Sequence, residues 1–322
     1  MKPLKLVPDD TNIPFLHYRN IAITLSILLM VASLVLCVVK GFNLGVDFLG
    51  GQSVRVSFPQ PVNIQTLRER VEALGVGEAT IQQFGSAGEV GIRTPLPEGD
   101  DAAANAAADR VRGVIVQNYP GARVGAVESV SGKVSNELFR TGAISLALAM
   151  LAITLYIWFR FEWQFGVGAL FALFHDVILT LGFFALTQLE FDLNIVAAIL
   201  TIIGYSLNDT IVVYDRIREN MRKYRKMEMA ALLDLSINET LSRTVVTSLS
   251  IGIVLGILLA LGPDVIFGFT AAMLLGIVIG TFSSVYVSAA ILLWLRLNPD
   301  SFVTRTTTGP AGAERVTSEG QV

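Results

Sequence analysis

The sequence has few of the residues on which most enzyme active sites depend. It contains one cysteine, Cys37, and only two histidines, His17 and His175. A single cysteine cannot form an intrachain disulfide, so any soluble part of the chain must be stable without one. Two separated histidines without a Cys/His cluster argue against a zinc site. We therefore expect neither a metal nor a cofactor.

Two motifs that would indicate an enzyme are also missing. No G-x-x-x-x-G-K-[ST] run occurs, which argues against ATP hydrolysis by a P-loop. Tyr214-Asp215 is similar to half of an intramembrane aspartyl protease signature. The other half requires Gly-x-Gly followed by Asp, whereas the Gly-x-Gly at 166–168 is followed by Ala169. We therefore expect a protein that is not an enzyme and has no catalytic residues.

Charged residues are scarce as well, at 16% of the chain against 52% hydrophobic residues, which is typical of a membrane protein. Six apolar stretches reach the length of about 20 residues that a helix needs to cross a bilayer. They lie near 20–39, 139–159, 165–187, 193–213, 244–262 and 266–295. The first is too long for the apolar region of a signal peptide and no small-x-small cleavage site follows it, so we expect it to remain as a span.

Basic residues in the connections between these stretches predict the orientation. The connection between the fourth and fifth stretches carries six of them, namely Arg216, Arg218, Arg222, Lys223, Arg225 and Lys226. Others precede the first stretch and follow the second, whereas the connections QLEFD and GPD have none. The positive-inside rule then predicts that both termini and the basic connection are cytoplasmic, and that the segment between the first two spans lies outside.

That long segment has the composition of a globular domain. Its pattern predicts strands at 52–58, 79–84, 90–94 and 122–130 and helices at 63–74 and 101–118. GSAG at 85–88 suits a hairpin turn between the second and third strands. The order βαββαβ is the split-βαβ, ferredoxin-like arrangement, which hosts many functions and implies none by itself. Residues 131–137 (SGKVSNE) are predicted to form a hinge before the second span.

The whole chain is thus predicted to be a polytopic α-helical membrane protein with one α+β domain. Its predicted parts are 1–19, a cytoplasmic segment; 20–40, the first transmembrane helix; 41–137, the periplasmic domain; 138–214, helices two to four; 215–241, a cytoplasmic amphipathic loop; 242–296, helices five and six; and 297–322, a disordered cytoplasmic tail. The basic loop either meets anionic lipid headgroups or docks a partner, and the pattern leaves both alternatives open.

Asp209 is the most informative residue of the membrane part. An ionised carboxylate costs roughly 2.5–3.5 kcal/mol in the middle of a span on insertion scales, so one that is kept there faces a partner or a water path. Alternatively Asp209 is interfacial, because Asp215 and Arg216 follow within about a turn and a half. Arg243, at the start of the fifth stretch, lies at a similar predicted depth. The pair is either a switchable proton relay or a static ion pair that anchors the helix ends.

Further polar residues on the third to sixth spans predict a shared polar interior. The candidates for a secondary network are His175, Asp176, Tyr205, Asn208 and Thr247, and the sixth span adds Thr281, Ser283, Ser284, Tyr286 and Ser288. His175-Asp176 either satisfies hydrogen bonds within the bundle or forms a second part of a proton route. Residues at helical spacing share a face, which places Asp209 with Tyr205 and Thr247 with Arg243.

Small residues also predict where helices pack closely. Gly252-x-x-x-Gly256 on the fifth span and Gly276-x-x-x-Gly280 on the sixth place two glycines one turn apart. Such pairs let helix backbones approach one another within a membrane.

Five segments carry a resemblance to a known family. GYSLNDTIVVYDRIREN (204–220), NETLSRTVVTSLS (238–250) and GIVIGTFSSVYVSA (276–289) resemble the signature series of SecF proteins, the smaller subunits of the SecD/SecF family within the RND superfamily. NLGVDFLGG (43–51) resembles the start of that family's periplasmic domain, and FHDVILTLG (174–182) its third-span motif. The resemblance runs from about Asn43 to Trp294, which leaves only the two ends of the chain outside it.

The resemblance implies an RND-type bundle with a periplasmic ferredoxin-like domain in the bacterial inner membrane. It implies a role in late preprotein translocation driven by the proton-motive force. The implied partners are a SecD subunit, the SecYEG translocon, YajC, the translocating preprotein, protons and membrane lipids, but no nucleic acid. Asp209 matches the family's span-four acidic residue and Arg243 its span-five arginine, both linked there to proton conduction.

The family's other key acidic residue lies in SecD, which this chain lacks, so the chain should not conduct protons productively alone. Six spans without an internal copy likewise suggest half of a transporter, whose site commonly lies between two repeats. Two other functions stay open from the residues: an assembly subunit without proton coupling, and an RND-type proton-coupled exporter of small molecules. The small size of the predicted outer domain counts against the exporter.

Overall fold

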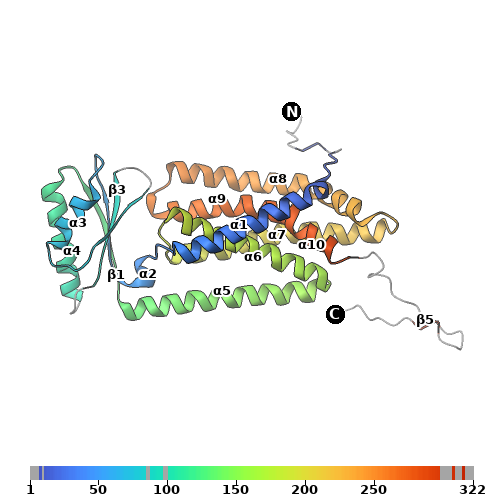
Figure 1. The fold of residues 1–322 in the computed structure, drawn as a ribbon, viewed down its shortest axis with the longest axis horizontal. Coiled ribbons are helices and arrows are strands. Elements are labelled where there is room, and N and C mark those ends of the chain that lie inside the picture. The colour runs from blue at the N-terminus through green and yellow to red at the C-terminus, as the bar shows by residue number, and fades with distance from the viewer. Residues whose placement is uncertain are drawn as a thin grey trace.

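A bundle of long helices carries a small α+β domain at one end in the computed structural model, which describes residues 7–8, 11–84, 88–96, 101–297, 307–308 and 314–315 (Figure 1). Six helical segments in this part of the chain are long and apolar enough to cross a membrane: Phe15–Val39, Gly132–Arg160, Trp163–Thr187, Leu193–Lys223, Met229–Leu261 and Phe267–Trp294. All six predicted spans are thereby confirmed. The predicted disordered tail lies mostly outside the described residues, apart from the short pair β5 (Thr307–Thr308) and β6 (Glu314–Arg315).

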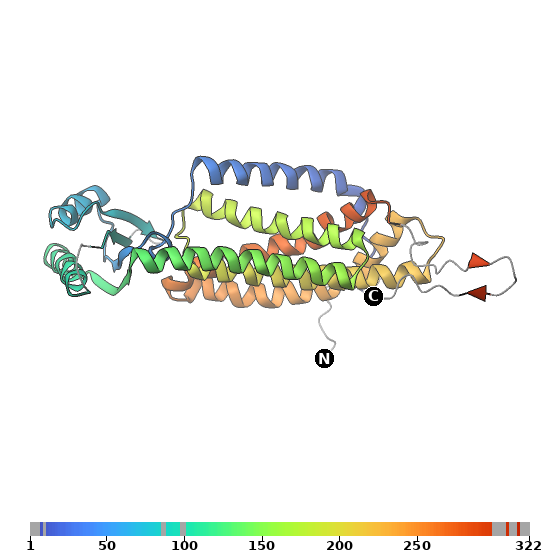
Figure 2. The same cartoon turned by 90° about the horizontal axis from the view of Figure 1, so that it is seen from below.

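The first span consists of a 3₁₀ turn followed by α1 (Arg19–Val39), and the next four are α5 (Gly132–Arg160), α6 (Trp163–Thr187), α7 (Leu193–Lys223) and α8 (Met229–Leu261). The last span is α9 (Phe267–Phe282), a π-helical turn (Ser283–Val287) and α10 (Ser288–Trp294). Figure 2 shows α1 running alongside α6.

Two connections that the sequence predicted as separate elements are largely helical. The loop predicted at 215–241 has a helical, amphipathic sequence pattern, and it is indeed mostly taken up by the end of α7 and the start of α8. Asn220 ties these extensions together, since its amide nitrogen donates to Ser236 Oγ at 3.0 Å and to Glu239 Oε2 at 2.6 Å. The prediction of a hinge at 131–137 is also wrong from Gly132 onward, where α5 begins. Ser131 instead caps α5, because its hydroxyl accepts from the backbone nitrogen of Val134 at 3.3 Å.

The α+β domain has the predicted βαββαβ order. Its elements are β1 (Gly51–Ser57), α3 (Ile64–Glu72), β2 (Thr80–Phe84), β3 (Glu89–Thr94), α4 (Asp101–Asn118) and β4 (Arg123–Val130), preceded by the short helix α2 (Val46–Leu49). The strands form an antiparallel sheet in the order β2-β3-β1-β4, as in ferredoxin-like folds. The turn predicted at 85–88 lies mostly outside the described residues, but Phe84 pairs with Glu89 and closes that hairpin.

One face of this sheet is covered by α3 and α4, and the other face looks toward the bundle (Figure 1). Val54, Val56 and Ile92 form part of the core with Leu67 of α3 and Ile115 of α4, both 0% exposed. Because side chains alternate along a strand, their neighbours Arg55 and Arg93 point to the opposite face. The sheet therefore presents charged residues to the end of the bundle.

The core of this domain gives a stability prediction with a control in the next residue. Ile115 is fully buried, whereas Val116 is 55% exposed. We expect Ile115→Ala to lower the free energy of unfolding of the domain by about 2–5 kcal/mol, because it removes apolar burial and leaves a cavity. Val116→Ala should change it by less than about 0.5 kcal/mol. Pulse proteolysis of the full chain in detergent and urea measures both, and equal losses would contradict the described packing.

Glycines let membrane helices approach one another closely at several positions. A Cβ on Gly182 of α6 would lie 2.9 Å from the Cα of Ser33 on α1. A Cβ on Gly276 of α9 would lie 2.4 Å from Ile202 Cγ1 on α7, and one turn later a Cβ on Gly280 would lie 3.1 Å from Ser206 Cβ on the same helix. The predicted packing of this second glycine pair is confirmed. Gly252 and Gly256 of α8 have open space instead, so that part of the prediction is wrong within the described part of the chain.

Candidate functional site

Two carboxylates lie inside the helix bundle. Asp176 of α6 is 0% exposed and Asp209 of α7 is 8% exposed. Among the described residues, neither carboxylate forms a salt bridge with a lysine or an arginine. A buried charge without such a partner must be stabilised by hydrogen bonds or be neutralised. The hydroxyl groups around both acids therefore define the site.

Asp176 is held by groups from its own helix and two others. Ser206 of α7 donates to Asp176 Oδ2 at 2.5 Å, and Ser283 of the π-helical turn donates to the same oxygen at 2.9 Å. His175 Nδ1 lies 2.9 Å from Oδ1, while His175 Nε2 is buried with no hydrogen-bond partner in the described part of the chain. The structure thus brings the predicted His175-Asp176 pair into the site.

Asp209 is held by two hydroxyls, one from α8 and one from the same π-helical turn. Thr244 of α8 donates to Asp209 Oδ1 at 2.6 Å, and Ser284 donates to Oδ2 at 2.6 Å. Ser283 and Ser284 are consecutive, so one short stretch of the last span contacts both acids. The site therefore joins α6, α7, α8 and the last span in a single polar row.

The π-helical turn explains how two consecutive serines serve two carboxylates. Ser283 and Ser284 begin this five-residue turn and both are 0% exposed. π-helical turns inside α-helices occur frequently at functional sites. Gly280, just before the turn, lets the last span approach α7, because a Cβ there would lie 3.1 Å from Ser206 Cβ. The sequence showed these serines to be polar residues in a span, but nothing in their spacing revealed that they bridge two acids.

The structure does not bring Arg243 onto Asp209. Arg243 is exposed on α8, and no salt bridge joins the two among the described residues. Its neighbour Thr244 makes the contact to Asp209 instead. Successive residues of a helix point about 100° apart, which turns Arg243 away when Thr244 points inward. The static ion pair considered from the sequence is therefore absent from this conformation.

The other predicted polar residues divide between the interior and the surface. Tyr205 is half-buried, and its hydroxyl lies 2.8 Å from Ser248 Oγ, which is in turn 2.8 Å from Thr281 Oγ1. This second row links α7, α8 and α9 one turn away from Asp209. Asn208 and Thr247 are exposed like Arg243, so the prediction that they face the interior is wrong.

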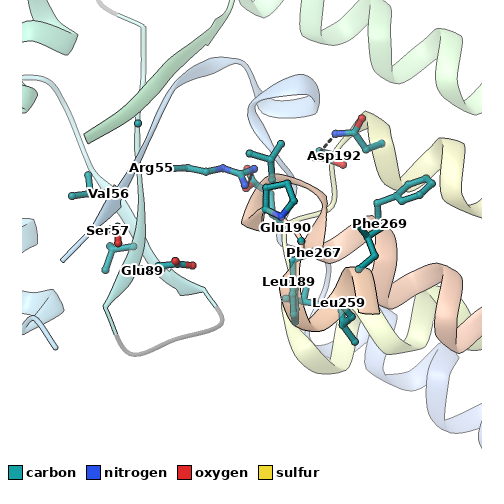
Figure 3. A pocket seen from close by; sticks show the side chains of 18 of the residues that line it. Arg55, Val56, Ser57, Glu89, Leu189, Glu190, Asp192, Leu259, Phe267 and Phe269 are labelled. Carbon is teal, nitrogen blue, oxygen red and sulfur yellow. Dashed lines mark hydrogen bonds and ion pairs between the residues drawn. The ribbon is translucent and has the colours of Figure 1, made fainter. Parts of the chain in front are cut away.

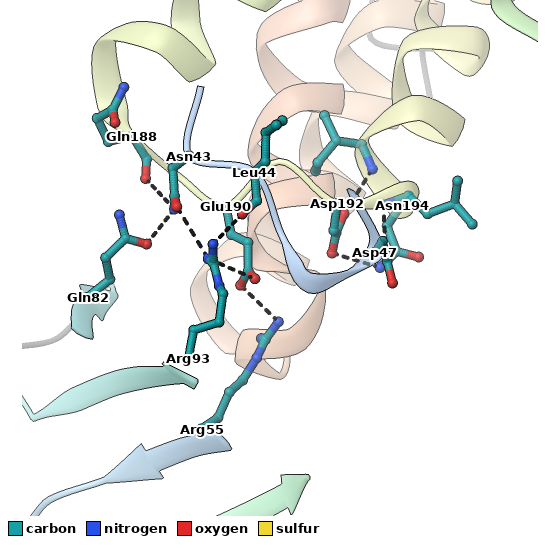
Figure 4. Close-up of polar contacts among 12 residues, drawn as sticks. Asn43, Leu44, Asp47, Arg55, Gln82, Arg93, Gln188, Glu190, Asp192 and Asn194 are labelled. Atoms are coloured by element: carbon teal, nitrogen blue, oxygen red, sulfur yellow. Dashed lines mark hydrogen bonds and ion pairs between the residues drawn. The ribbon is translucent and has the colours of Figure 1, made fainter. Parts of the chain in front are cut away.

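Polar contacts also join the bundle to the α+β domain, through the connection 188–192 between α6 and α7 (Figure 4). Phe191 donates its backbone N–H to the Asn43 carbonyl at 2.7 Å, and Gly45 donates to the Phe191 carbonyl at 2.9 Å. In the same place Arg93 and Arg55 of the sheet form salt bridges with Glu190, at 3.4 and 3.7 Å. Residues 43–45 belong to the NLGVDFLGG segment, so this motif docks the domain.

Beside these contacts lies a cavity of about 780 Å³ (Figure 3). One wall is the end of the sheet, with Arg55, Ser57 and Glu89. The other walls come from the α6–α7 connection and from the α8–α9 connection, which contributes Pro263 and Phe267. The α+β domain is thus in contact with the bundle on one side and separated from it on the other. No group of three or more His, Cys, Asp or Glu in the described part of the chain is placed to hold a metal ion.

Comparisons with known families and proteins agree on one family. The family model described as "Protein export membrane protein SecD/SecF, C-terminal" matches residues 113–298, and the "SecD/SecF GG Motif" matches residues 35–62. The protein translocase subunit SecF of Vibrio alginolyticus is 42% identical over 300 residues, covering 92% of this chain and 94% of its own. The SecF subunit of Cereibacter sphaeroides is 42% identical over 298 residues, covering 91% and 92%.

Solved structures show the same likeness in three dimensions. The crystal structure of SecDF from Thermus, a translocon-associated membrane protein, superposes with a TM-score of 0.82 at 36% identity over 91% of this chain. A SecDF structure in a super-membrane-facing form gives a TM-score of 0.64 at 34% identity over 92% of this chain. This chain spans about 40% of the length of each of those SecDF chains. The chain belongs to the SecD/SecF family of protein export membrane proteins and, within it, to the SecF subunits of the protein translocase.

Proposed function

We propose that this chain, together with a SecD subunit, uses the proton-motive force to drive preproteins across the bacterial inner membrane. The observation that carries the proposal is the pair of buried carboxylates, Asp176 and Asp209, held by hydroxyls and, at Asp176, by His175, with no lysine or arginine among the described salt bridges to either acid. Ionisable groups inside a membrane are costly and mark proton or ion pathways. A carboxylate that gains or loses a proton there changes which hydrogen bonds its neighbours can make.

The hydroxyls around the acids suit proton transfer. A serine hydroxyl can donate and accept at once, so it can pass a proton between two groups that it touches. Ser283 contacts Asp176 and the adjacent Ser284 contacts Asp209. We infer that protonation of one acid rearranges this pair of serines, and that the rearrangement alters how the last span packs against α6 and α7.

The energy available is sufficient for a directional step. One elementary charge crossing 100 mV releases about 2.3 kcal/mol. Since about 1.4 kcal/mol is a factor of ten in an equilibrium constant, one proton biases a two-state equilibrium about fiftyfold. Several protons per cycle would supply enough free energy for a conformational change that works against a larger opposing force.

The missing half of the site is proposed to come from SecD. Asn208, Arg243 and Thr247 are exposed on α7 and α8 although they lie within membrane-spanning helices. Polar side chains rarely face lipid, so a protein surface is expected to cover them. The family's second key acid, supplied by SecD, would meet Arg243 there. The SecDF relatives of known structure are longer than this chain, and their additional residues are proposed to correspond to the half that SecD supplies here.

The proposed orientation follows from the basic residues. Arg160, Arg218 and Arg222 lie at the end of the bundle opposite to the α+β domain, whereas residues 188–192 have neither lysine nor arginine. The positive-inside rule then places both termini in the cytoplasm and the α+β domain in the periplasm, where it would contact the emerging preprotein. SecYEG, YajC and membrane lipids complete the proposed surroundings.

Export into inverted membrane vesicles tests the proposal. Vesicles from a strain depleted of its own SecF subunit are supplied with this chain and SecD, and import of a labelled preprotein is followed with ATP, with and without an ionophore. We expect the chain to accelerate import only while the proton gradient is intact. An assembly subunit would give the same acceleration with the ionophore present, and that result would refute proton coupling. Gradient-dependent efflux of a small molecule without an effect on import would favour an exporter.

A further inference from the structure

Glu190 occupies the covalent link between the two helices that carry the buried acids. It lies in the connection 188–192, which follows α6 with Asp176 and precedes α7 with Asp209. A shift of either helix at its acid would reach this short connection along the helix, since both helices run without interruption from the acids to it. The position of Glu190 therefore reports on the arrangement of the acid site.

The α+β domain holds Glu190 from its sheet. Arg93 Nη2 of β3 lies 3.4 Å from Glu190 Oε1, and Arg55 Nη2 of β1 lies 3.7 Å from Oε2 (Figure 4). These strands are neighbours at the centre of the sheet. The side chains of Arg93 and Glu190 are only 13% and 12% exposed, so their attraction is screened far less than that of a surface pair. Arg93 also donates to the backbone carbonyl of Leu44.

Burial makes this contact sensitive to the loss of either partner. Burial raises the pKa of Glu190, and the charges of Arg93 and Arg55 oppose that rise. Burial likewise lowers the pKa of Arg93, and the charge of Glu190 opposes it. Each charge is thus stabilised by the other, and removing Glu190 leaves Arg93 buried without that compensation, whereas Glu190 keeps Arg55 when Arg93 is removed. The negative charges of Asp192 and Glu128 add to the rise in the pKa of Glu190, which increases its dependence on the two arginines.

A cavity begins directly beside this contact, since Arg55 and Glu190 both line it. The cavity of about 780 Å³ separates the end of the sheet, at Ser57 and Arg123, from the α8–α9 connection at Pro263 and Val265 (Figure 3). A domain that is held at one edge and spaced at the other can rotate about the held edge until the space closes. Glu190 lies at the held edge, which makes it the pivot of that rotation.

We propose that Glu190 is the positioning residue through which rearrangement at Asp176 and Asp209 turns the α+β domain on the bundle. The proposal rests on the proposed function, since it assumes that the acids change state in the working cycle. It adds the route by which that change reaches the domain: along α6 and α7 to Glu190, then through Arg93 and Arg55 to the two central strands of the sheet. It also gives the direction of motion, toward the α8–α9 connection.

The test measures the position of the domain directly. The only cysteine, Cys37, is replaced by alanine, and spin labels are attached at Val116 of α4 and Leu261 of α8, which are 55% and 83% exposed and do not line the cavity. The chain is reconstituted with SecD in liposomes. The distance between the labels is measured with and without an imposed proton gradient, and proton uptake is followed with a pH-sensitive dye.

We expect the gradient to shift the distance in the parent chain and to leave it unshifted in Glu190→Gln, while proton uptake continues. Arg93→Gln should reduce the shift, because Arg55 still pairs with Glu190. The double variant should lose no more than Glu190→Gln alone, because Glu190→Gln already removes the interaction with Arg93. Glu78→Gln, which neutralises an exposed acid of the same domain, should keep the shift. A purely structural role for Glu190 would change stability without removing the response to the gradient.

Results that contradict the inference can be distinguished from results that contradict the proposed function. A shift of normal size in Glu190→Gln would overturn the inference and leave the proposed function standing. Proton uptake without any shift in the parent chain would also overturn it, since the domain would then not follow the acids. Absence of both uptake and shift in the parent chain would sink the inference together with proton coupling.

Discussion

Asp209→Asn is expected to abolish the part of preprotein export that depends on the proton gradient. The asparagine keeps the size and most hydrogen-bonding capacity of the aspartate, so Thr244 and Ser284 can still bond to it. It cannot take up or release a proton. Export with ATP and an intact gradient should therefore fall to the rate seen with an ionophore, a loss of up to about fiftyfold per proton at 100 mV.

The same helix offers a matched control for this variant. Asp215 lies six residues after Asp209 and forms a salt bridge with Arg160 at 3.0 Å, with both side chains more than 40% exposed. Exposed pairs of this kind contribute about 0–1 kcal/mol to stability, so Asp215→Asn should leave gradient-dependent export intact. Co-purification of Asp209→Asn with SecD shows whether the complex still assembles. Gradient-dependent export by an assembled Asp209→Asn complex would exclude Asp209 from proton transfer.

Gly182→Ala is expected to destabilise the helix bundle strongly, because it adds a methyl group where two helices are in contact. The new Cβ would lie 2.1 Å from Ser33 Oγ and 2.9 Å from Ser33 Cα, so the backbones of α1 and α6 must separate. Overpacking of this kind costs typically about 1–3 kcal/mol and occasionally more. We expect a lower midpoint of thermal unfolding in detergent and a lower yield of folded chain in the membrane.

Gly252→Ala is the control for this variant. It separates the effect of the α1–α6 contact from the effect of replacing a glycine by alanine within a helix. Both positions lie inside long helices, where alanine is favoured over glycine by about 1 kcal/mol, and this gain applies to both variants. A Cβ at Gly252 meets nothing within 4 Å. Thermal unfolding should therefore be unchanged or higher for Gly252→Ala and clearly lower for Gly182→Ala. Equal midpoints for the two variants would mean that α1 does not pack on α6 as described.

Features with a strong periodicity could be predicted from the sequence. The six spans are continuous apolar stretches, and the βαββαβ order follows from alternation in segments such as 52–58 and from helix ends marked by turn residues. Each of these signals is local, and tertiary contacts did not override it. The hinge at 131–137 failed because its glycine and serines resemble a flexible linker, although Ser131 is also a good helix N-cap.

The partners of the two acids could not be predicted in the same way. Asp176 and Asp209 were identifiable as acids in apolar stretches, but their partners depend on how four helices are rotated about their own axes. Arg243 was considered as the partner of Asp209 because the two residues lie at a similar predicted depth and carry opposite charges. The rotation of α8 instead turns Thr244 inward, and a threonine carries no comparable signal in a sequence. Glu190 was not predicted either, since its arginines lie in a different domain.

The π-helical turn at Ser283–Val287 also limits how the last span can be read as a linear pattern. A continuous α-helix lets one assign faces by counting residues in steps of three and four. The extra residue in this turn advances the count by one, so the faces before and after it are offset by about 100°. Gly280 and Ser288 are therefore not on the faces that uniform counting assigns to them relative to each other. For an engineer, deleting one residue here would restore a regular helix and leave one of the two acids without its serine.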